Sequence, residues 1–212
     1  MKRVIDLFGA SVGLLLLAPL FLLVALLVKI TSRGPIFFTQ IRVGKNFVPF
    51  RFLKFRTMTV QEAAGPLVTS SSDGRITTVG RFLRRTKLDE LPQLLNVLRG
   101  DMSLVGPRPE VPKFIQMFEQ DYKDILRIRP GITDWNSLEF MDEEMLLRNE
   151  ADVEKSYIEK IMPLKIRNQR RYVDSRSFWV DMDILARTVG SVVFRRGASH
   201  HAEKDDATLK LT

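Results

Sequence analysis

The sequence has no cysteine and only two histidines among its 212 residues. Both histidines, His200 and His201, lie in a polar stretch close to the C-terminus. The lack of cysteine excludes disulfide bonds and cysteine-zinc sites, and it permits a reducing, cytosolic environment. Because the rest of the chain has no histidine, any chemistry there must use Asp, Glu, Lys, Arg, Ser, Thr or Tyr.

The common nucleotide-binding loops are also missing. The chain has neither a GxxxxGK phosphate loop nor a GxGxxG motif, so a nucleotide would have to bind without them. Acidic side chains are outnumbered: there are 33 Lys and Arg against 25 Asp and Glu, and the formal net charge is +8. This balance indicates an anionic partner, which is a phospholipid, a nucleotide or a nucleic acid.

One uncharged apolar run lies near the N-terminus, from Leu7 to Val28. It is long enough to cross a bilayer and too long for an ordinary signal peptide. Pro19 interrupts it, and basic residues flank both ends, whereas a crossing helix normally carries its positive excess on one side. A kinked transmembrane helix and a helix that bends at Pro19 and returns to the same face both fit these observations.

An acidic pair, Asp89-Glu90, opens an apolar helical run in the middle of the chain. Pro92 suits a first helical turn and Gly100 a helix end, so we predict a helix from about Asp89 to Gly100. The helix dipole should favour ionised carboxylates there. Adjacent helical residues point about 100° apart, so the two carboxylates must perform different tasks. By itself, the pair is more typical of a charge-capped surface helix.

Basic side chains surround this pair in the sequence. A helix start among arginines and lysines is a natural anion site. Arg108 lies between Pro107 and Pro109, and each proline restricts its own φ and the residue before it. Arg108 should therefore be presented on stiff backbone. The other basic residues near the pair are Arg81, Arg84, Arg85, Lys87 and Arg99.

Two stretches carry a resemblance to a known family: Leu88-Asp-Glu-Leu-Pro-Gln-Leu94 and Gly100-Asp-Met-Ser-Leu-Val-Gly-Pro-Arg-Pro109. With most of the surrounding chain, they resemble the bacterial sugar transferases called small monotopic phosphoglycosyl transferases. Members of that family transfer a sugar-1-phosphate from a UDP-sugar to undecaprenyl phosphate, a polyprenol phosphate, and release UMP. The resemblance implies the first membrane step of glycoconjugate or polysaccharide synthesis.

The resemblance also implies roles for single residues. Asp89 would be the catalytic nucleophile that forms a covalent aspartyl sugar-phosphate intermediate. Glu90 would be catalytic as a ligand of Mg²⁺, the implied cofactor. Arg84, Arg108 and Lys54 would bind the substrate. Without the resemblance, the stretch around Lys54 is as typical of an ordinary basic strand face as of a phosphate-binding site.

The implied fold class is α+β and mostly helical, with a re-entrant membrane helix, a small β-hairpin and amphipathic interfacial helices around a cytosolic active site. The chain would divide into the re-entrant helix (1–34), a catalytic domain (35–196) and a polar, disordered tail (197–212). The protein would lie in the bacterial cytoplasmic (inner) membrane among phospholipid, with its active site on the cytoplasmic face. No nucleic acid is expected as a partner, and the sequence does not decide whether the protein forms a homodimer.

Local patterns predict several further elements. The helix around 178–189 carries Trp179 and Val189 and suits either a membrane interface or a core. An amphipathic helix is expected over 110–128, with its apolar stripe facing a core or the membrane surface. The others are a hairpin of strands at 36–42 and 47–55, a loop over 61–73 and an acidic helix over 142–162.

Three stretches depart from the commonest family sequence. Ala18 replaces a serine, so the hydroxyl that would help to hold the bend before Pro19 is absent. Asp134-Trp-Asn-Ser-Leu-Glu-Phe-Met141 replaces a Gly-Trp-Ala-Gln-Val-Asn-Gly-Arg type sequence, which indicates a subgroup with its own substrate. The segment Asn168–Arg171 stands where the family has an aspartate, and no site residue is assigned there.

The main alternative to a transferase is a membrane-anchored, basic nucleic-acid-binding or scaffold protein. The positive charge and the aromatic residues permit it. No recognised nucleic-acid motif accompanies them, however, and this alternative gives Asp89 and Glu90 no task.

Overall fold

The computed structural model describes residues 1–59, 73–140, 147 and 152–193. Within them the chain is mostly helical, with a two-stranded antiparallel hairpin and a short parallel strand pair, which confirms the expected mostly helical class. The predicted loop over 61–73 and most of the acidic stretch over 142–151 lie outside the described residues. The described elements are α1 (Lys2–Thr31), β1 (Phe37–Val43), η1 (Lys45–Phe47), β2 (Pro49–Phe55), α2 (Thr78–Thr86), η2 (Leu88–Glu90), α3 (Gln93–Arg99), β3 (Ser103–Val105), α4 (Pro112–Met117), α5 (Glu119–Ile125), β4 (Gly131–Thr133), α6 (Trp135–Glu139), α8 (Val153–Ser156), η3 (Tyr157–Ile161), α9 (Met162–Ser175) and α10 (Phe178–Val193).

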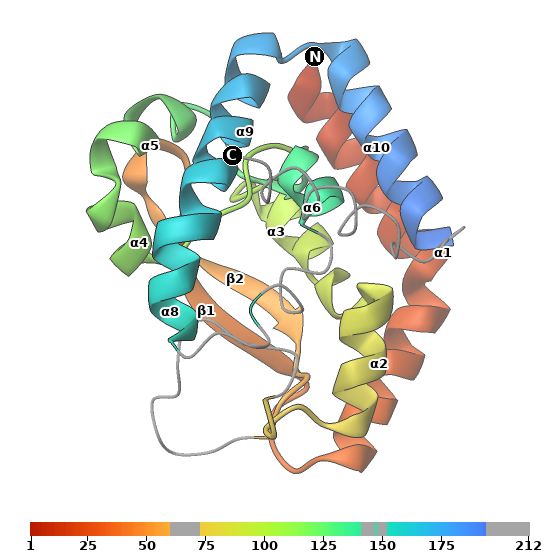
Figure 1. Ribbon diagram of the computed structural model, residues 1–212. Coiled ribbons are helices and arrows are strands. Elements are labelled where there is room, and N and C mark those ends of the chain that lie inside the picture. The colour runs from red at the N-terminus through yellow and green to blue at the C-terminus, as the bar shows by residue number, and fades with distance from the viewer. Residues whose placement is uncertain (60–72, 141–146, 148–151, 194–212) are drawn as a thin grey trace, which may run out of the picture.

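The apolar N-terminal run forms the single helix α1, which is long and apolar enough to cross a membrane. The helix continues through Pro19, and its predicted return to the same face stays a prediction. One side is buried against the rest of the chain at Ala10, Val24 and Val28. In Figure 1, α1 runs along the molecule beside α2 and α10. Its opposite side, here called the outer face of α1, exposes Val4, Phe8, Leu15, Leu16, Leu22, Leu23, Leu26 and Ile30.

Polar contacts fix the start of α1 to the middle of the chain. The buried Asp6 carboxylate accepts hydrogen bonds from Ser103 Oγ at 2.9 Å and from the Leu104 backbone N–H at 3.0 Å. Arg3 donates to the Val97 carbonyl oxygen at 2.6 Å, at the C-terminal end of α3. A buried carboxylate needs such donors, so Asp6 favours this one docking position of the helix.

The end of α1 is fixed by an arginine of the hairpin. Arg56 is buried, and its guanidinium donates to the carbonyl oxygens of Ser32 at 2.7 Å and Arg33 at 3.0 Å. Aromatic packing adds to this, since the Phe21 and Phe55 rings are 4.8 Å apart between centroids. Arg56 therefore caps α1 and has a structural role. Both ends of the membrane-length helix are tied to the same domain.

The predicted hairpin is confirmed, with β1 and β2 paired antiparallel from Phe37 opposite Phe55 to Val43 opposite Pro49. Asn46 and Phe47 have φ values of 55° and 62°, so the connection uses the left-handed region that asparagine tolerates best. The strand β2 brings Lys54 to the end of the hairpin that lies beside α2 and η2.

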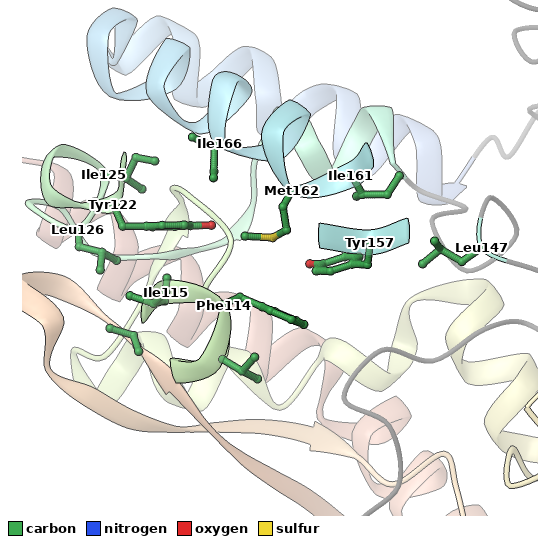
Figure 2. Packing of buried hydrophobic residues seen from close by; sticks show 12 residues of the cluster. Phe114, Ile115, Tyr122, Ile125, Leu126, Leu147, Tyr157, Ile161, Met162 and Ile166 are labelled. Atoms are coloured by element: carbon green, nitrogen blue, oxygen red, sulfur yellow. The ribbon is translucent and has the colours of Figure 1, made fainter. Parts of the chain in front are cut away.

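The amphipathic stretch over 110–128 forms two helices rather than one. Phe118 leaves helical geometry, with φ −122° and ψ 32°, and separates α4 from α5. The apolar stripe faces a core that these helices share with η3 and α9, as Figure 2 shows. Phe114 and Tyr157 meet there, with ring centroids 5.0 Å apart. This settles the stripe as core, and its buried members include Val111, Phe114, Ile115, Tyr122 and Ile125.

The helix α2 packs very closely against the residues that follow β2. A Cβ atom on Gly80 would lie 1.9 Å from the Thr57 carbonyl oxygen, so only glycine permits this approach. Thr57 is buried, and its hydroxyl accepts a hydrogen bond from Arg84 Nε at 2.9 Å. Gly80 thus fixes where α2, and Arg84 with it, stands relative to β2.

We predict that Gly80→Ala destabilises the protein by about 1–3 kcal/mol or more, because α2 must move away from Thr57. Thermal unfolding in detergent or nanodiscs would measure the change. Gly190→Ala is the matched control, because a Cβ there meets nothing within 4 Å and alanine favours a helix. Equal melting temperatures for Gly80→Ala and the unmodified protein would show that the close approach is not required.

Candidate active site

The acidic pair lies in the short turn η2, between α2 and α3. The prediction that a helix begins near Asp89 is wrong, because α3 begins only at Gln93, with Pro92 before it. Lys87, at φ 58°, turns the chain sharply out of α2, and η2 accommodates that turn before α3 starts. The predicted end is confirmed, since Gly100 closes α3 in a left-handed conformation.

Asp89 is buried, and its Oδ1 atom has no hydrogen-bond partner among the described residues. Its Oδ2 atom lies 3.8 Å from Lys54 Nζ. Burial raises the pKa of Asp89 above its ordinary value by more than Lys54 lowers it. The expectation that a helix dipole would favour the ionised form is therefore wrong for Asp89, because desolvation outweighs the favourable charges.

Glu90 has the opposite environment. Its Oε1 atom accepts from Arg108 Nη2 at 2.5 Å and from Lys54 Nζ at 3.0 Å, and its Oε2 atom accepts from Arg108 Nη1 at 3.2 Å. Burial alone would raise the pKa of Glu90, but Arg108 and Lys54 together hold it well below its ordinary value. Glu90 thus has two cationic partners, whereas Asp89 has only the longer contact with Lys54 and keeps Oδ1 without a partner among the described residues, which suits the two carboxylates to different roles.

Four of the five predicted site residues meet directly: Lys54, Asp89, Glu90 and Arg108. Arg84 lies beside them on α2 and is close enough for its charge to lower the pKa of Asp89. Its Nε atom is bonded to Thr57. The arrangement is a compact cluster of charged side chains from four parts of the chain, and the role of each residue stays a prediction.

Sequence reasoning missed three buried polar side chains: Gln93, Asp134 and Gln169. Gln93 stands one turn after Asp89, and neither atom of its amide has a partner among the described residues. Asp134 and Gln169 bond to the backbone of Arg108, at 3.2 Å and 3.1 Å. The one sequence feature that could have pointed to Asp134 and Gln169 is that both lie in stretches that depart from the family sequence. Met141, which ends the same departing stretch as Asp134, lies outside the described residues.

The donor set fits a shared Mg²⁺ rather than an ion enclosed by protein. Among the described residues, no group of three or more His, Cys, Asp or Glu side chains could hold a metal. Mg²⁺ is commonly held by one or two carboxylates together with substrate phosphates and water. Within the described part of the chain, Asp89 Oδ1 has no hydrogen bond, and Glu90 Oε2 accepts one where a carboxylate oxygen can accept two.

Comparison with known proteins identifies the family. The model of the family described as bacterial sugar transferase matches residues 1–195. The chain belongs to the bacterial sugar transferase family. This confirms the resemblance inferred from the motifs around Asp89 and Arg108.

Three curated relatives of this bacterial sugar transferase illustrate its similarities. It is 37% identical to an undecaprenyl-phosphate glucose phosphotransferase from Komagataeibacter xylinus, over 93% of this chain and 36% of that protein. It is 40% identical to a UDP-glucose:undecaprenyl-phosphate glucose-1-phosphate transferase from Caulobacter vibrioides, over 91% of this chain and 69% of that protein. It is 36% identical to the exopolysaccharide production protein ExoY from Rhizobium meliloti, over 93% of this chain and 87% of that protein.

The lengths of these relatives differ. The chain spans 36% of the Komagataeibacter protein and 44% of an N-acetylgalactosamine phosphotransferase from Aeromonas hydrophila, to which it is 36% identical. The chain therefore corresponds to less than half the length of these two relatives.

We predict that carboxyl ¹³C NMR will find Asp89 titrating above 3.8 and Glu90 below 4.5, their ordinary pKa values. Lys54→Met removes a positive charge that lowers the pKa of both groups, so both midpoints should rise. Lys45→Met, in the exposed hairpin turn, is the control and should leave them unchanged. An Asp89 midpoint below 3.8 would mean that burial does not dominate its electrostatics.

Proposed function

We propose that the protein transfers a sugar-1-phosphate from a UDP-sugar to undecaprenyl phosphate through a covalent intermediate on Asp89, with release of UMP. The observation that carries this proposal is the contrast within the acidic pair. Asp89 is buried and its Oδ1 atom has no partner among the described residues, whereas Glu90 beside it pairs with Lys54 and Arg108. The activities for which the relatives from Komagataeibacter and Caulobacter are named support the same reaction class.

In the first step, an oxygen of Asp89 attacks the phosphorus that bears the sugar. The bond from that phosphorus to the bridging oxygen breaks, and UMP leaves with the electron pair. Among the described residues, Oδ1 has no hydrogen bond that must break before it attacks. Arg108 and Lys54 stabilise the negative charge on the phosphoryl oxygens, with Arg84 in support. Glu90 would hold Mg²⁺, and a bound Mg²⁺ would neutralise charge on the diphosphate.

In the second step, a phosphate oxygen of undecaprenyl phosphate attacks the same phosphorus. The bond between Asp89 and phosphorus breaks, the carboxylate is restored, and the lipid leaves as a sugar diphosphate. Because one carboxylate serves both steps, the soluble nucleotide and the lipid can use the same group of cations in turn. The product is suited to the first membrane step of glycoconjugate or polysaccharide synthesis.

The way α1 is held supports entry into the membrane from one side only. At about 1.5 Å per residue, a helix of 30 residues is about 45 Å long, enough for a whole bilayer. Asp6 near its start and Ser32 after its end both bond to the same domain. A straight crossing would draw that domain into the lipid. A re-entrant path, with the outer face of α1 in one leaflet and the active site on the cytoplasmic face, avoids this.

We predict that the protein with Mg²⁺ and its UDP-sugar, but no lipid, releases up to about one equivalent of UMP per active site. Asp89→Asn should abolish both this first release and turnover, because a neutral amide is a far poorer nucleophile. Asp124→Asn, on the exposed side of α5, is the control and should retain both. A quench-flow assay of UMP gives the amounts.

The competing mechanism is direct attack by the lipid phosphate, with Asp89 as a second ligand of Mg²⁺. It requires lipid before any UMP appears, and its initial rates follow a ternary-complex pattern rather than a ping-pong one. A strict requirement for lipid in the first turnover would remove Asp89 from the role of nucleophile.

The absence of cysteine makes a topology test simple. We expect Met1→Cys, placed behind an affinity tag, and Thr39→Cys both to react with a membrane-impermeant maleimide from the cytoplasmic side alone. The reason is that both ends of α1 are bound to one domain. Labelling of residue 1 from the periplasmic side, with residue 39 still cytoplasmic, would show a full crossing.

A further inference from the structure

The segment that carries Arg108 is held entirely by contacts from elsewhere in the chain. We call residues Pro107 to Glu110 the arginine strap. Two of its four residues are prolines without an N–H, so the strap cannot form regular structure of its own. Every backbone carbonyl in it accepts a hydrogen bond. The donors, in order from Pro107 to Glu110, are Gly131 N, Gln169 Nε2, Arg42 Nη1 and Val43 N.

Arg108 itself is held on both sides by buried side chains. Its N–H donates to Asp134 Oδ2 at 3.2 Å, and its carbonyl oxygen accepts from Gln169 Nε2 at 3.1 Å. Asp134 and Gln169 are each 1% exposed, and they follow Arg108 by 26 and 61 residues. The backbone of this arginine therefore depends on two side chains that lie outside its own motif.

Asp134 links the strap to α6. Its Oδ1 atom accepts from Ser137 N at 2.8 Å and Ser137 Oγ at 2.9 Å, so one carboxylate caps α6 and also binds Arg108. The commonest sequence in the resembling family has glycine here, which has no side chain to make either bond. In this chain the side chain of Asp134 therefore contacts the backbone of Arg108.

The helix α9 holds the strap at a second point, one turn before Gln169. Lys165 Nζ lies 2.9 Å from Glu110 Oε1, which also accepts from the Tyr157 hydroxyl at 2.9 Å. Glu110 and Lys165 are both buried, so this ion pair is fully enclosed. Gln169 is accordingly part of a rigid support and not a side chain with many alternative positions.

We propose that Asp134 and Gln169 are positioning residues, which set the guanidinium of Arg108 so that it pairs with Glu90 and meets the substrate diphosphate. The inference rests on the proposed function, because that function assigns Arg108 to the phosphates. A planar guanidinium binds two oxygens at once only in a narrow range of orientations. A displacement of about 1 Å at such a group can lower a rate about 100-fold.

Two substitutions remove these bonds with little other change. Gln169→Met keeps the length of the side chain and removes the donor, and nothing is lost at Oε1, which has no partner among the described residues. Asp134→Ser keeps a good cap for α6 but is too short to reach Arg108. Asn168→Ala is the matched control, because the Asn168 amide bonds to Asn136 and Glu139 and not to the strap.

Each substitution is made in the unmodified chain and in Arg108→Ala, and three quantities are measured: UDP affinity in Mg²⁺ buffer, UMP release and melting temperature. We expect Gln169→Met and Asp134→Ser to weaken UDP binding and UMP release about 10- to 100-fold when Arg108 is present. In Arg108→Ala they should change either by less than about twofold. The melting temperature should fall equally in both backgrounds. The bonds that the substitutions remove go to the backbone of residue 108, which is the same whether the side chain there is arginine or alanine. Asn168→Ala should leave UDP affinity unchanged.

Equal losses of UDP affinity in both backgrounds would overturn the proposal, because Asp134 and Gln169 would then support the fold in general. Unchanged UDP affinity in both variants would overturn it too. If the two substitutions weaken UDP binding only when Arg108 is present, but the protein releases no UMP, the proposed function alone is contradicted. Failure of the unmodified protein to bind UDP would overturn both.

Discussion

The candidate site depends on how two adjacent buried carboxylates are kept from destabilising each other. Burial raises the free energy of each ionised form, and their mutual repulsion adds to it. The structure resolves this by giving Glu90 the bidentate Arg108 and the ammonium of Lys54, while Asp89 keeps an unpartnered oxygen. The two carboxylates therefore differ in their environments, and the proposed function assigns the nucleophile to Asp89 and the cation contacts to Glu90.

The rest of the described fold brings distant segments to this pair. β2 supplies Lys54, η2 supplies the carboxylates, and the strap supplies Arg108. α1 lies against the same elements through α3, β2 and β3, so the helix that suits a membrane and the site that suits phosphates share one support. Under the proposed function, an active site held at the bilayer surface would reduce the entropy cost of bringing a soluble and a lipid substrate together.

Local patterns in the sequence predicted the hairpin and the end of α3 at Gly100, and the family resemblance named the residues that lie together at the site. Those predictions succeeded because turn residues, apolar periodicity and long motifs act over short distances along the chain. The start of α3 was wrong because a sequence pattern does not show that Lys87 turns the chain before Pro92. The pKa direction of Asp89 was wrong because desolvation depends on what surrounds the residue in space.

The contacts of Arg108 with Asp134 and Gln169 were not predictable for the same reason, since they join residues far apart in the chain. Nothing in the local sequence of either residue specifies a partner, and Gln169 lies in a basic stretch that is typical of a solvated helix face. Only the packing of α6 and α9 around the strap shows what they hold.

The central claim is that Asp89 carries the sugar phosphate between the two substrates. The most direct measurement is mass spectrometry of the protein after incubation with Mg²⁺ and its UDP-sugar, without lipid. The account predicts a mass increase of one sugar phosphate on the peptide that contains Asp89, and its loss when undecaprenyl phosphate is added. An unmodified Asp89 peptide, in a preparation that turns over once lipid is supplied, would contradict it.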